Sequence, residues 1–212
     1  MLTTIRNTVP FTQEDLAVAT DADAQRPARA DARKNQEALL AAARDVFARS
    51  GVDAPAREIA AAAKVGVGTM YRHFPTRSEL VAAVFTTEID GTAAAAADLL
   101  ATHAPGEALE LWISRFTRFV ATKQGLSAAL RSGDPAFDAL PDYFAAKLGP
   151  AIRSLLDAAE AAGEVRSGVD ALGLLQAVGD LSHRAPSADG SPNAMVRLLL
   201  DGLRVNAAGS AG

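Results

Sequence analysis

The sequence of 212 residues predicts an all-α fold, and three observations carry this prediction. Apolar residues make up 49% of the chain and alanine is abundant, whereas aromatic residues account for only 5%, a composition that favours helices over sheets. From about residue 31 onward, apolar residues recur at helical spacing. No segment alternates between apolar and polar residues in the manner of a half-buried strand.

Residues 1–30 are expected to form a mostly disordered arm, because they lack sustained periodicity and contain Pro10 and Pro27. A first helix is expected from Asp31, which can act as its N-cap, to Gly51, which ends it. The apolar stripe of this helix consists of Leu39, Leu40, Ala43, Val46 and Phe47.

Three more helices are expected in the next part of the chain. Pro55 suits the first turn of a helix that ends near residue 63, and a short helix follows over residues 67–73. Pro75 breaks that helix. Thr76 and Glu79 then form a capping box for an alanine-rich helix that runs past residue 90.

Five helices are expected after Pro105, and the longer ones carry clear apolar faces. Their approximate ranges are 105–124, 126–132, 141–163, 168–182 and 191–206. The chain therefore divides into a three-helix N-terminal domain, residues 31–80, and a six-helix C-terminal domain, residues 81–212.

Charge is distributed unevenly along the chain, whose net charge is −4. Residues 26–80 contain ten Lys or Arg and six Asp or Glu, a local balance of +4. Residues 1–25 carry −3 and residues 81–212 carry −5. A basic segment within an acidic protein is typical of a nucleic-acid-binding domain joined to a second domain.

Other features limit the class of protein. The chain has no cysteine, which excludes disulfides, thiolate metal sites and cysteine nucleophiles and fits a reducing compartment. No apolar run approaches the length of about 20 residues that a membrane span needs. The first six residues lack the basic and apolar regions of a secretion signal, so we expect a cytoplasmic protein.

Residues 59–74 predict a short helix, a tight turn and a second short helix, which is the layout of a helix-turn-helix. The second helix of this motif enters the major groove of DNA. Gly68 lets its backbone approach DNA closely, and the hydroxyls of Thr69 and Tyr71 can bond phosphate oxygens. Arg72 can make a bidentate contact with guanine.

This block closely resembles the DNA-binding domain of TetR-family transcriptional regulators. The positions in register with the family pattern are Ile59-Ala60, Val65, Gly68-Thr69-Met70-Tyr71-Arg72-His73-Phe74, Arg77 and Glu79-Leu80. The resemblance is strong over residues 33–80 and extends to the rest of the chain by helix count and length. It implies a homodimeric transcriptional regulator. The expected function is that of a repressor, which binds a palindromic DNA operator and is released from it by a small ligand.

The chain departs from the family pattern at three positions. Lys64 stands where the turn usually has a glycine, which would strain the backbone if that residue needs a positive φ. Gly66 can cap a helix but offers no hydroxyl. Pro55 lies near a position where many members carry a phosphate-binding threonine.

The predicted DNA contacts combine the motif with nearby basic residues, which could reach the backbone or the minor groove. They are Arg29, Arg33, Lys34, Lys64, Val67, Gly68, Thr69, Tyr71, Arg72, His73 and Arg77. Two alternatives remain open. His73 can be a packed histidine at a helix end, and the basic residues 29, 33 and 34 can be a solvated helix start.

The C-terminal domain is expected to hold an apolar effector pocket and the dimer interface. The predicted pocket residues are Trp112, Phe116, Phe119, Phe144, Leu148, Gln176 and His183. The alternative is that the same apolar residues close into a solid core. The predicted interface residues, from the last two helices, are Leu172, Leu175, Gly179, Met195, Leu198, Leu199 and Gly202.

No catalytic set or metal site is predicted. No two of the three histidines have ligand spacing, and no serine stands in a nucleophile-elbow pattern. No cofactor is expected. Two other classes of protein remain alternatives: a helical interaction module with a degenerate helix-turn-helix, and, less favoured, an all-α enzyme.

Overall fold

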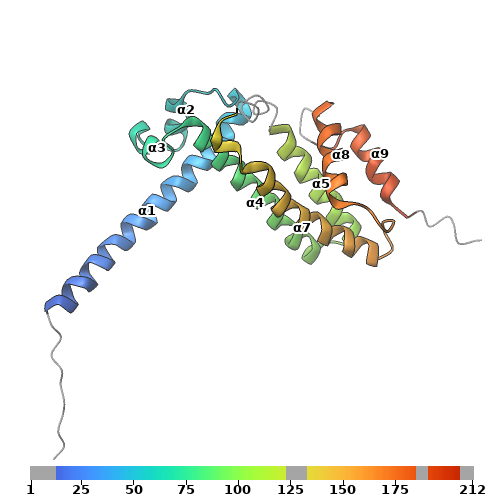
Figure 1. Cartoon of the computed structure of the whole chain (residues 1–212), viewed down its shortest axis with the longest axis horizontal. Coiled ribbons are helices and arrows are strands. Elements are labelled where there is room, and N and C mark those ends of the chain that lie inside the picture. The colour runs from blue at the N-terminus through green and yellow to red at the C-terminus, as the bar shows by residue number, and fades with distance from the viewer. Residues whose placement is uncertain (1–12, 123–132, 185–190, 206–212) are drawn as a thin grey trace, which may run out of the picture.

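The computed structural model describes residues 13–122, 133–184 and 191–205, with side chains described from residue 31. These residues form eight α-helices and one 3-10 helix, and their only β-pairing is an isolated bridge, which confirms the all-α fold (Figure 1). The helices are α1 (Gln13–Ser50), α2 (Ala56–Ala62), α3 (Val67–His73), α4 (Arg77–Thr102), α5 (Pro105–Thr122), η1 (Pro135–Phe137), α7 (Leu140–Ala161), α8 (Ala171–Arg184) and α9 (Ala194–Leu203). The helix predicted at 126–132 lies outside the described residues.

Helix α1 is much longer than the sequence predicted. It begins at Gln13 rather than at Asp31, so the prediction of a disordered arm is wrong for residues 13–30, and residues 1–12 lie outside the described part. Residues 13–30 are rich in alanine and contain no glycine. Extending an existing helix needs no new nucleus, and the alanine-rich segment continues α1 away from the body of the protein although Pro27 cannot donate a backbone hydrogen bond within it (Figure 1).

Two hydrophobic cores lie side by side along the chain. The N-terminal core joins α1, α2, α3 and the start of α4; its larger members are Leu39, Val46, Ile59, Met70, Phe74, Leu80 and Val84. The C-terminal core joins α4, α5, α7, α8 and α9; it includes Phe85, Ile89, Trp112, Ile113, Phe116, Leu148, Leu155, Leu175 and Val196. Helix α4 contributes to both cores, and the predicted boundary at residue 80 falls within it.

Helix α4 connects the two cores and packs against helices of both domains. Its N-cap Thr76 accepts a hydrogen bond from the backbone N–H of Glu79 at 3.1 Å, which is the first of the two bonds that a capping box contains. Gly91 does not interrupt the helix. By length and composition alone α4 could cross a membrane, but its apolar residues are shared between the two cores, as expected for the central helix of a globular protein.

Polar contacts hold α4 against the helices of the bundle. The indole N–H of Trp112 donates to the backbone carbonyl of Thr92 at 2.7 Å. On the surface, the Tyr143 hydroxyl donates to Asp90 at 2.7 Å, and Lys147 lies 3.2 Å from the same carboxylate. The hydrogen bond to Asp90 raises the pKa of both Tyr143 and Lys147. These contacts fix the register of α4 against α5 and α7.

Candidate nucleic-acid interface and effector domain

The turn between α2 and α3 is closed by a helix-ending motif built around Lys64. The N–H of Val65 donates to the carbonyl of Ala60 at 3.0 Å, and the N–H of Lys64 donates to Ala61 at 3.1 Å. This pair of bonds is a Schellman motif, which requires a left-handed residue after the C-cap. Lys64 supplies it with a φ of 57°, the one positive φ of a non-glycine residue in the described chain. The predicted strain at Lys64 is therefore present.

Helix α3 has one face in the protein and one face in solvent. Met70 is buried in the N-terminal core, and Phe74, the C-cap of the helix, is buried beside it. On the opposite face Val67 is 39% exposed and Tyr71 is 49% exposed, unusual values for large apolar or aromatic side chains. Such a face on a short helix has the shape that entry into a DNA groove requires.

The remaining predicted contacts of α3 differ in accessibility. Gly68 and Arg72 are exposed, whereas Thr69 and His73 are half-buried. The Arg72 side chain folds back along its own helix, donating to the carbonyl of Gly68 at 3.3 Å and to the hydroxyl of Thr69 at 3.2 Å. These exposed bonds can exchange for contacts with DNA. The ring of His73 lies 6.4 Å from that of Phe74, so both interpretations of this histidine remain open.

Arg77 has a structural partner that the sequence did not reveal. Its guanidinium donates to the backbone carbonyls of Val52 and Ala54, the latter at 2.7 Å, in the loop between α1 and α2. A guanidinium that satisfies two loop carbonyls holds this loop against the start of α4. Arg77 therefore has a role within the N-terminal domain, and because its side chain is exposed, its contact with a phosphate stays a prediction.

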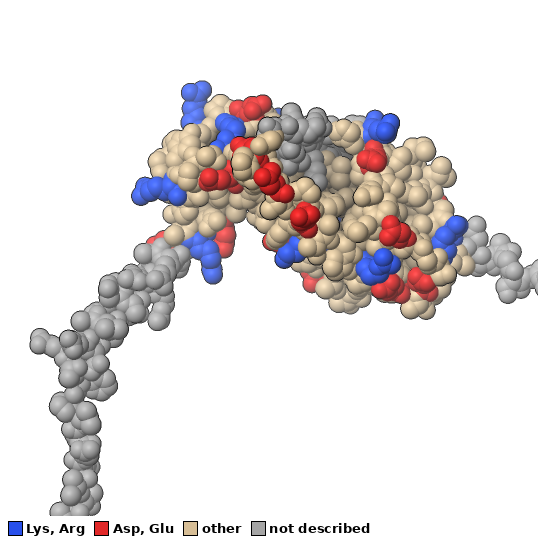
Figure 2. Space-filling model, in the orientation of Figure 1, with Lys and Arg blue, Asp and Glu red and all other residues tan. Residues whose placement is uncertain are grey.

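The other basic residues lie on exposed surface. Lys34 and Lys64 are exposed, and Arg33 lies 3.4 Å from Glu37 one turn along α1. The side chain of Arg29 lies outside the described ones. Basic groups project from the end of the molecule that holds α2 and α3, with acidic groups among them (Figure 2).

The predicted effector residues divide between a solid core and an open hollow. Phe116, Phe144 and Gln176 line a hollow of about 450 Å³ between α5, α7 and α8. Its other lining residues are Val120, Leu175, Gly179 and Asp180. Beneath the hollow, Trp112 is fully buried and stacks on Phe116 with ring centroids 5.8 Å apart.

Four predicted effector residues lie outside the lining of that hollow. Trp112 and Leu148 are fully buried core residues, and Phe119 is buried with its ring stacked 6.4 Å from that of Phe144. His183 is exposed near the end of α8. Trp112, Leu148 and Phe119 thus lie in the C-terminal core beside Phe85 and Ile89 of α4, the arrangement that the solid-core alternative describes.

The last two helices present an apolar surface to solvent. Leu172 is 45% exposed, Met195 52% and Leu198 64%. Leu199 is half-buried and Gly202 is exposed, whereas the half-buried Gly179 lines the hollow between α5, α7 and α8. Leu175 is only 2% exposed because it points into its own bundle and lines the hollow, so its assignment to the dimer interface is wrong.

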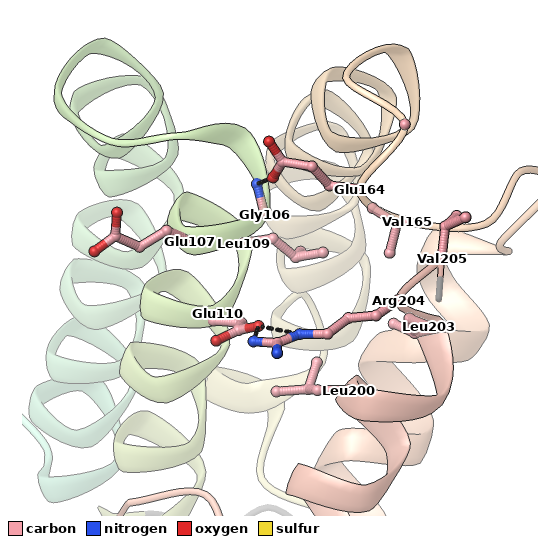
Figure 3. A pocket seen from close by; sticks show the side chains of 11 residues that line it. Gly106, Glu107, Leu109, Glu110, Glu164, Val165, Leu200, Leu203, Arg204 and Val205 are labelled. Carbon is pink, nitrogen blue, oxygen red and sulfur yellow. Dashed lines mark hydrogen bonds and ion pairs between the residues drawn. The ribbon is translucent and has the colours of Figure 1, made fainter. Parts of the chain in front are cut away.

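A second hollow, of about 520 Å³, lies at the opposite end of the bundle, and no sequence pattern predicted it (Figure 3). The carboxylate of Glu164 accepts from the N–H of Gly106 at 2.6 Å and so caps the start of α5. Arg204 pairs with Glu110 across the opening, its Nε 3.0 Å from the carboxylate. Val165 and Arg204 form the isolated antiparallel bridge. These contacts tie the end of α9 to α5 and α7.

No group of three or more metal-binding side chains occurs within residues 31–120, 133–184 and 191–205. Taken together, an exposed helix-turn-helix on one core and a helical bundle on another define a two-domain helix-turn-helix protein.

Two family profiles match different parts of the chain. One, described as bacterial regulatory proteins of the tetR family, matches residues 39–84. The other, described as the C-terminal domain of SbtR-like transcriptional regulators, matches residues 104–205.

Solved structures resemble the chain over most of its length. A TetR transcriptional regulator of Streptomyces coelicolor is 35% identical with a TM-score of 0.70, over 81% of this chain and 99% of that one. A TetR transcription regulatory protein of Mycobacterium vanbaalenii is 37% identical with a TM-score of 0.65, over 84% and 100%. The chain therefore belongs to the TetR family of transcriptional regulators.

A curated relative matches over a shorter region. An HTH-type transcriptional repressor of Mycobacterium tuberculosis is 39% identical over 85 residues, which is 40% of this chain and 43% of that protein. The match spans less than half the length of this relative.

Proposed function

We propose that this protein is a cytoplasmic, homodimeric repressor that binds a palindromic DNA operator through α3 and leaves it when a small ligand occupies the C-terminal domain. The exposed face of α3, with Val67, Tyr71 and Arg72 pointing away from the N-terminal core, is the observation that carries the proposal. Family membership supports it, since the relatives are named as transcriptional regulators.

DNA binding is tested by selecting genomic fragments with the full-length protein and measuring affinity for the recovered site. Arg72→Ala should weaken binding to that site by about 1–3 kcal/mol and relax the preference at one base pair. Tyr71→Phe should weaken binding to every sequence alike, because a phosphate contact carries no base information. Arg153→Ala, on the exposed surface of α7, is the matched control. A folded protein that prefers no fragment over bulk DNA would exclude this function and favour the interaction module.

Dimerisation is proposed through the outer face of α8 and α9. Leu172, Met195 and Leu198 expose apolar side chains there, and a two-fold interface uses the same face of both copies. Two recognition helices held in this way would contact half-sites about 34–36 Å apart. Light scattering should therefore find a dimer at micromolar concentration, and the selected operator should be an approximate palindrome.

The hollow between α5, α7 and α8 is the proposed effector site. Its wall is apolar and aromatic, with Phe116 and Phe144 6.1 Å apart between ring centroids. Among the described lining residues Asp180 is the only ionisable one, and Gln176 precedes it by one turn of α8. A carboxylate beside aromatic rings favours a ligand with an apolar ring and a hydrogen-bond donor or an amine, and repels an anionic one.

Two probes of similar ring and opposite charge test this assignment: phenethylamine and 3-phenylpropionate. The amine should raise the melting temperature by mass action and change the fluorescence of Trp112, the only tryptophan, which stacks on Phe116. Asp180→Asn should remove the preference for the amine, whereas Asp157→Asn, on exposed surface of α7, should not.

Gly179→Leu tests the location of the effector site. A β-carbon at Gly179 meets nothing within 4 Å, so a larger side chain there can project from α8 toward the hollow that this residue lines. This variant should fold and bind the operator but lose the response to the amine. An effector that still acts on Gly179→Leu would place the site elsewhere and leave the regulator proposal intact.

A further inference from the structure

Helix α4 opens with two adjacent side chains that bind different parts of the protein. Arg77 donates to the carbonyls of Val52 and Ala54, in the N-terminal domain. Ser78 reaches the other way, and its hydroxyl donates to the carboxylate of Asp134 at 2.5 Å, 56 residues further along the chain. The first turn of α4 is therefore attached on one side to the DNA-binding core and on the other to the bundle.

Asp134 is itself held in place at the start of the segment that leads into α7. Its second carboxylate oxygen accepts from the N–H of Ala136 at 3.0 Å, so Asp134 is the N-cap of η1. Phe137, the last residue of η1, is buried in the C-terminal core. A displacement of η1 must therefore move Asp134, and through it Ser78.

The same segment leads to the proposed effector site. After η1, α7 begins at Leu140, which is buried in the C-terminal core, and one turn later Phe144 lines the hollow. An unbroken path of packed or bonded groups thus runs from the wall of the hollow through η1 and Asp134 to the start of α4.

The carboxylate of Asp134 is a strong hydrogen-bond acceptor for the Ser78 hydroxyl. The hydrogen bond from Ser78, followed by that from Ala136, lowers its pKa. The group therefore stays ionised throughout the neutral range, and a hydrogen bond to an ionised acceptor is shorter and stronger than one between neutral groups. Both Ser78 and Asp134 are half-buried, which limits competition from water.

We propose that Ser78 and Asp134 are a pair of positioning residues that fix the angle of the helix-turn-helix relative to the C-terminal bundle. Resting on the proposed function, the pair transmits occupancy of the effector hollow to α3. Neither residue contacts DNA or effector in this scheme. Their hydrogen bond is the element that differs between the operator-bound and the released states.

The first experiment measures the position of the helix-turn-helix relative to the C-terminal bundle in the absence of DNA. The chain has no cysteine, so Ala61→Cys on α2 and Asp157→Cys on α7, both exposed, accept one spin label each. Labelled protein is diluted with excess unlabelled protein to suppress distances between protomers, and the distance distribution is recorded by pulsed electron resonance. Ser78→Ala and Asp134→Asn should broaden or shift the distribution, and Ser78→Thr, which keeps the hydroxyl, should restore it. Ser154→Ala, which removes a hydroxyl that donates to the carbonyl of Ala151 within α7, is the control.

The second experiment measures the consequence for operator binding. Ser78→Ala and Asp134→Asn should each weaken operator affinity about fivefold or more, the lower end of typical coupling between sites. The double variant should be no weaker than the stronger single variant, because both changes remove one contact. Circular dichroism confirms that each variant is folded.

The outcomes separate the two proposals. Unchanged distance distributions in Ser78→Ala and Asp134→Asn overturn the positioning pair whatever the protein binds. Additive losses of operator affinity overturn it too, because two residues that act through one bond cannot be independent. Altered distributions in a protein that recognises no operator support the positioning role and refute the proposed function alone.

Discussion

Lys64 gives the sharpest test of the local structure, because one substitution should raise stability and lower DNA affinity together. A non-glycine residue in the left-handed region costs about 1–2 kcal/mol, and Lys64 occupies that region with a φ of 57°. Lys64→Gly removes this strain. The greater conformational freedom of glycine in the unfolded chain opposes the gain and lowers the free energy of unfolding by about 0.4–1 kcal/mol. The net stabilisation should be about 0.5–1 kcal/mol, or roughly 1–4 °C in melting temperature for a domain of this size.

Lys64→Ala separates the backbone effect from the charge effect. Both variants lose the same ammonium group, but alanine keeps the β-carbon that makes the left-handed conformation costly. In thermal unfolding followed by circular dichroism, only Lys64→Gly should be more stable than the wild type. In operator titrations at several salt concentrations, both should lower the salt slope by about 0.9 if Lys64 contacts one phosphate. Equal melting temperatures for the glycine and alanine variants would refute the strain argument.

Three other outcomes are expected. Leu198→Glu should yield a folded monomer in light scattering because this side chain is 64% exposed, whereas Leu200→Glu, at a position 8% exposed, should unfold the protein; a dimeric Leu198→Glu would move the interface off α9. Trp112→Phe should lower the free energy of unfolding in urea by about 1–3 kcal/mol, because the hydrogen bond to the Thr92 carbonyl and part of the core packing are lost; an unchanged midpoint would show that the bond is not stabilising. Asp134 has a folded-state pKa below its unfolded value, so its contribution is present above the unfolded pKa and is lost as the pH falls through the folded one; Asp134→Asn should therefore have a flatter acid limb below about pH 4, in unfolding followed against pH.

Patterns among residues close together in the sequence were enough to predict most of the helices and the helix-turn-helix. The spacing of Thr76 and Glu79 predicted the start of α4, and in the structure Thr76 accepts a hydrogen bond from the N–H of Glu79. The family resemblance placed Lys64 at a turn position that usually carries glycine, where a positive φ would strain it, and the backbone has that positive φ. Such features depend on bonds spanning a few residues, so the residues within one turn are enough to specify them. The family resemblance over residues 33–80 rests on the same local patterns.

Only the tertiary structure decided which partner each side chain meets. Periodicity placed Leu175 on an apolar face of α8 but did not show that this face turns into its own bundle. The sequence placed Arg77 near a helix start, as a cation available for a phosphate. It did not show the loop carbonyls that Arg77 binds, which lie 23 and 25 residues earlier. The hydrogen bond between Ser78 and Asp134 spans 56 residues, and the pair of Glu110 and Arg204 spans 94. Contacts at such separations depend on how whole helices pack, and a pattern with a period of 3.6 residues identifies a face without naming what covers it.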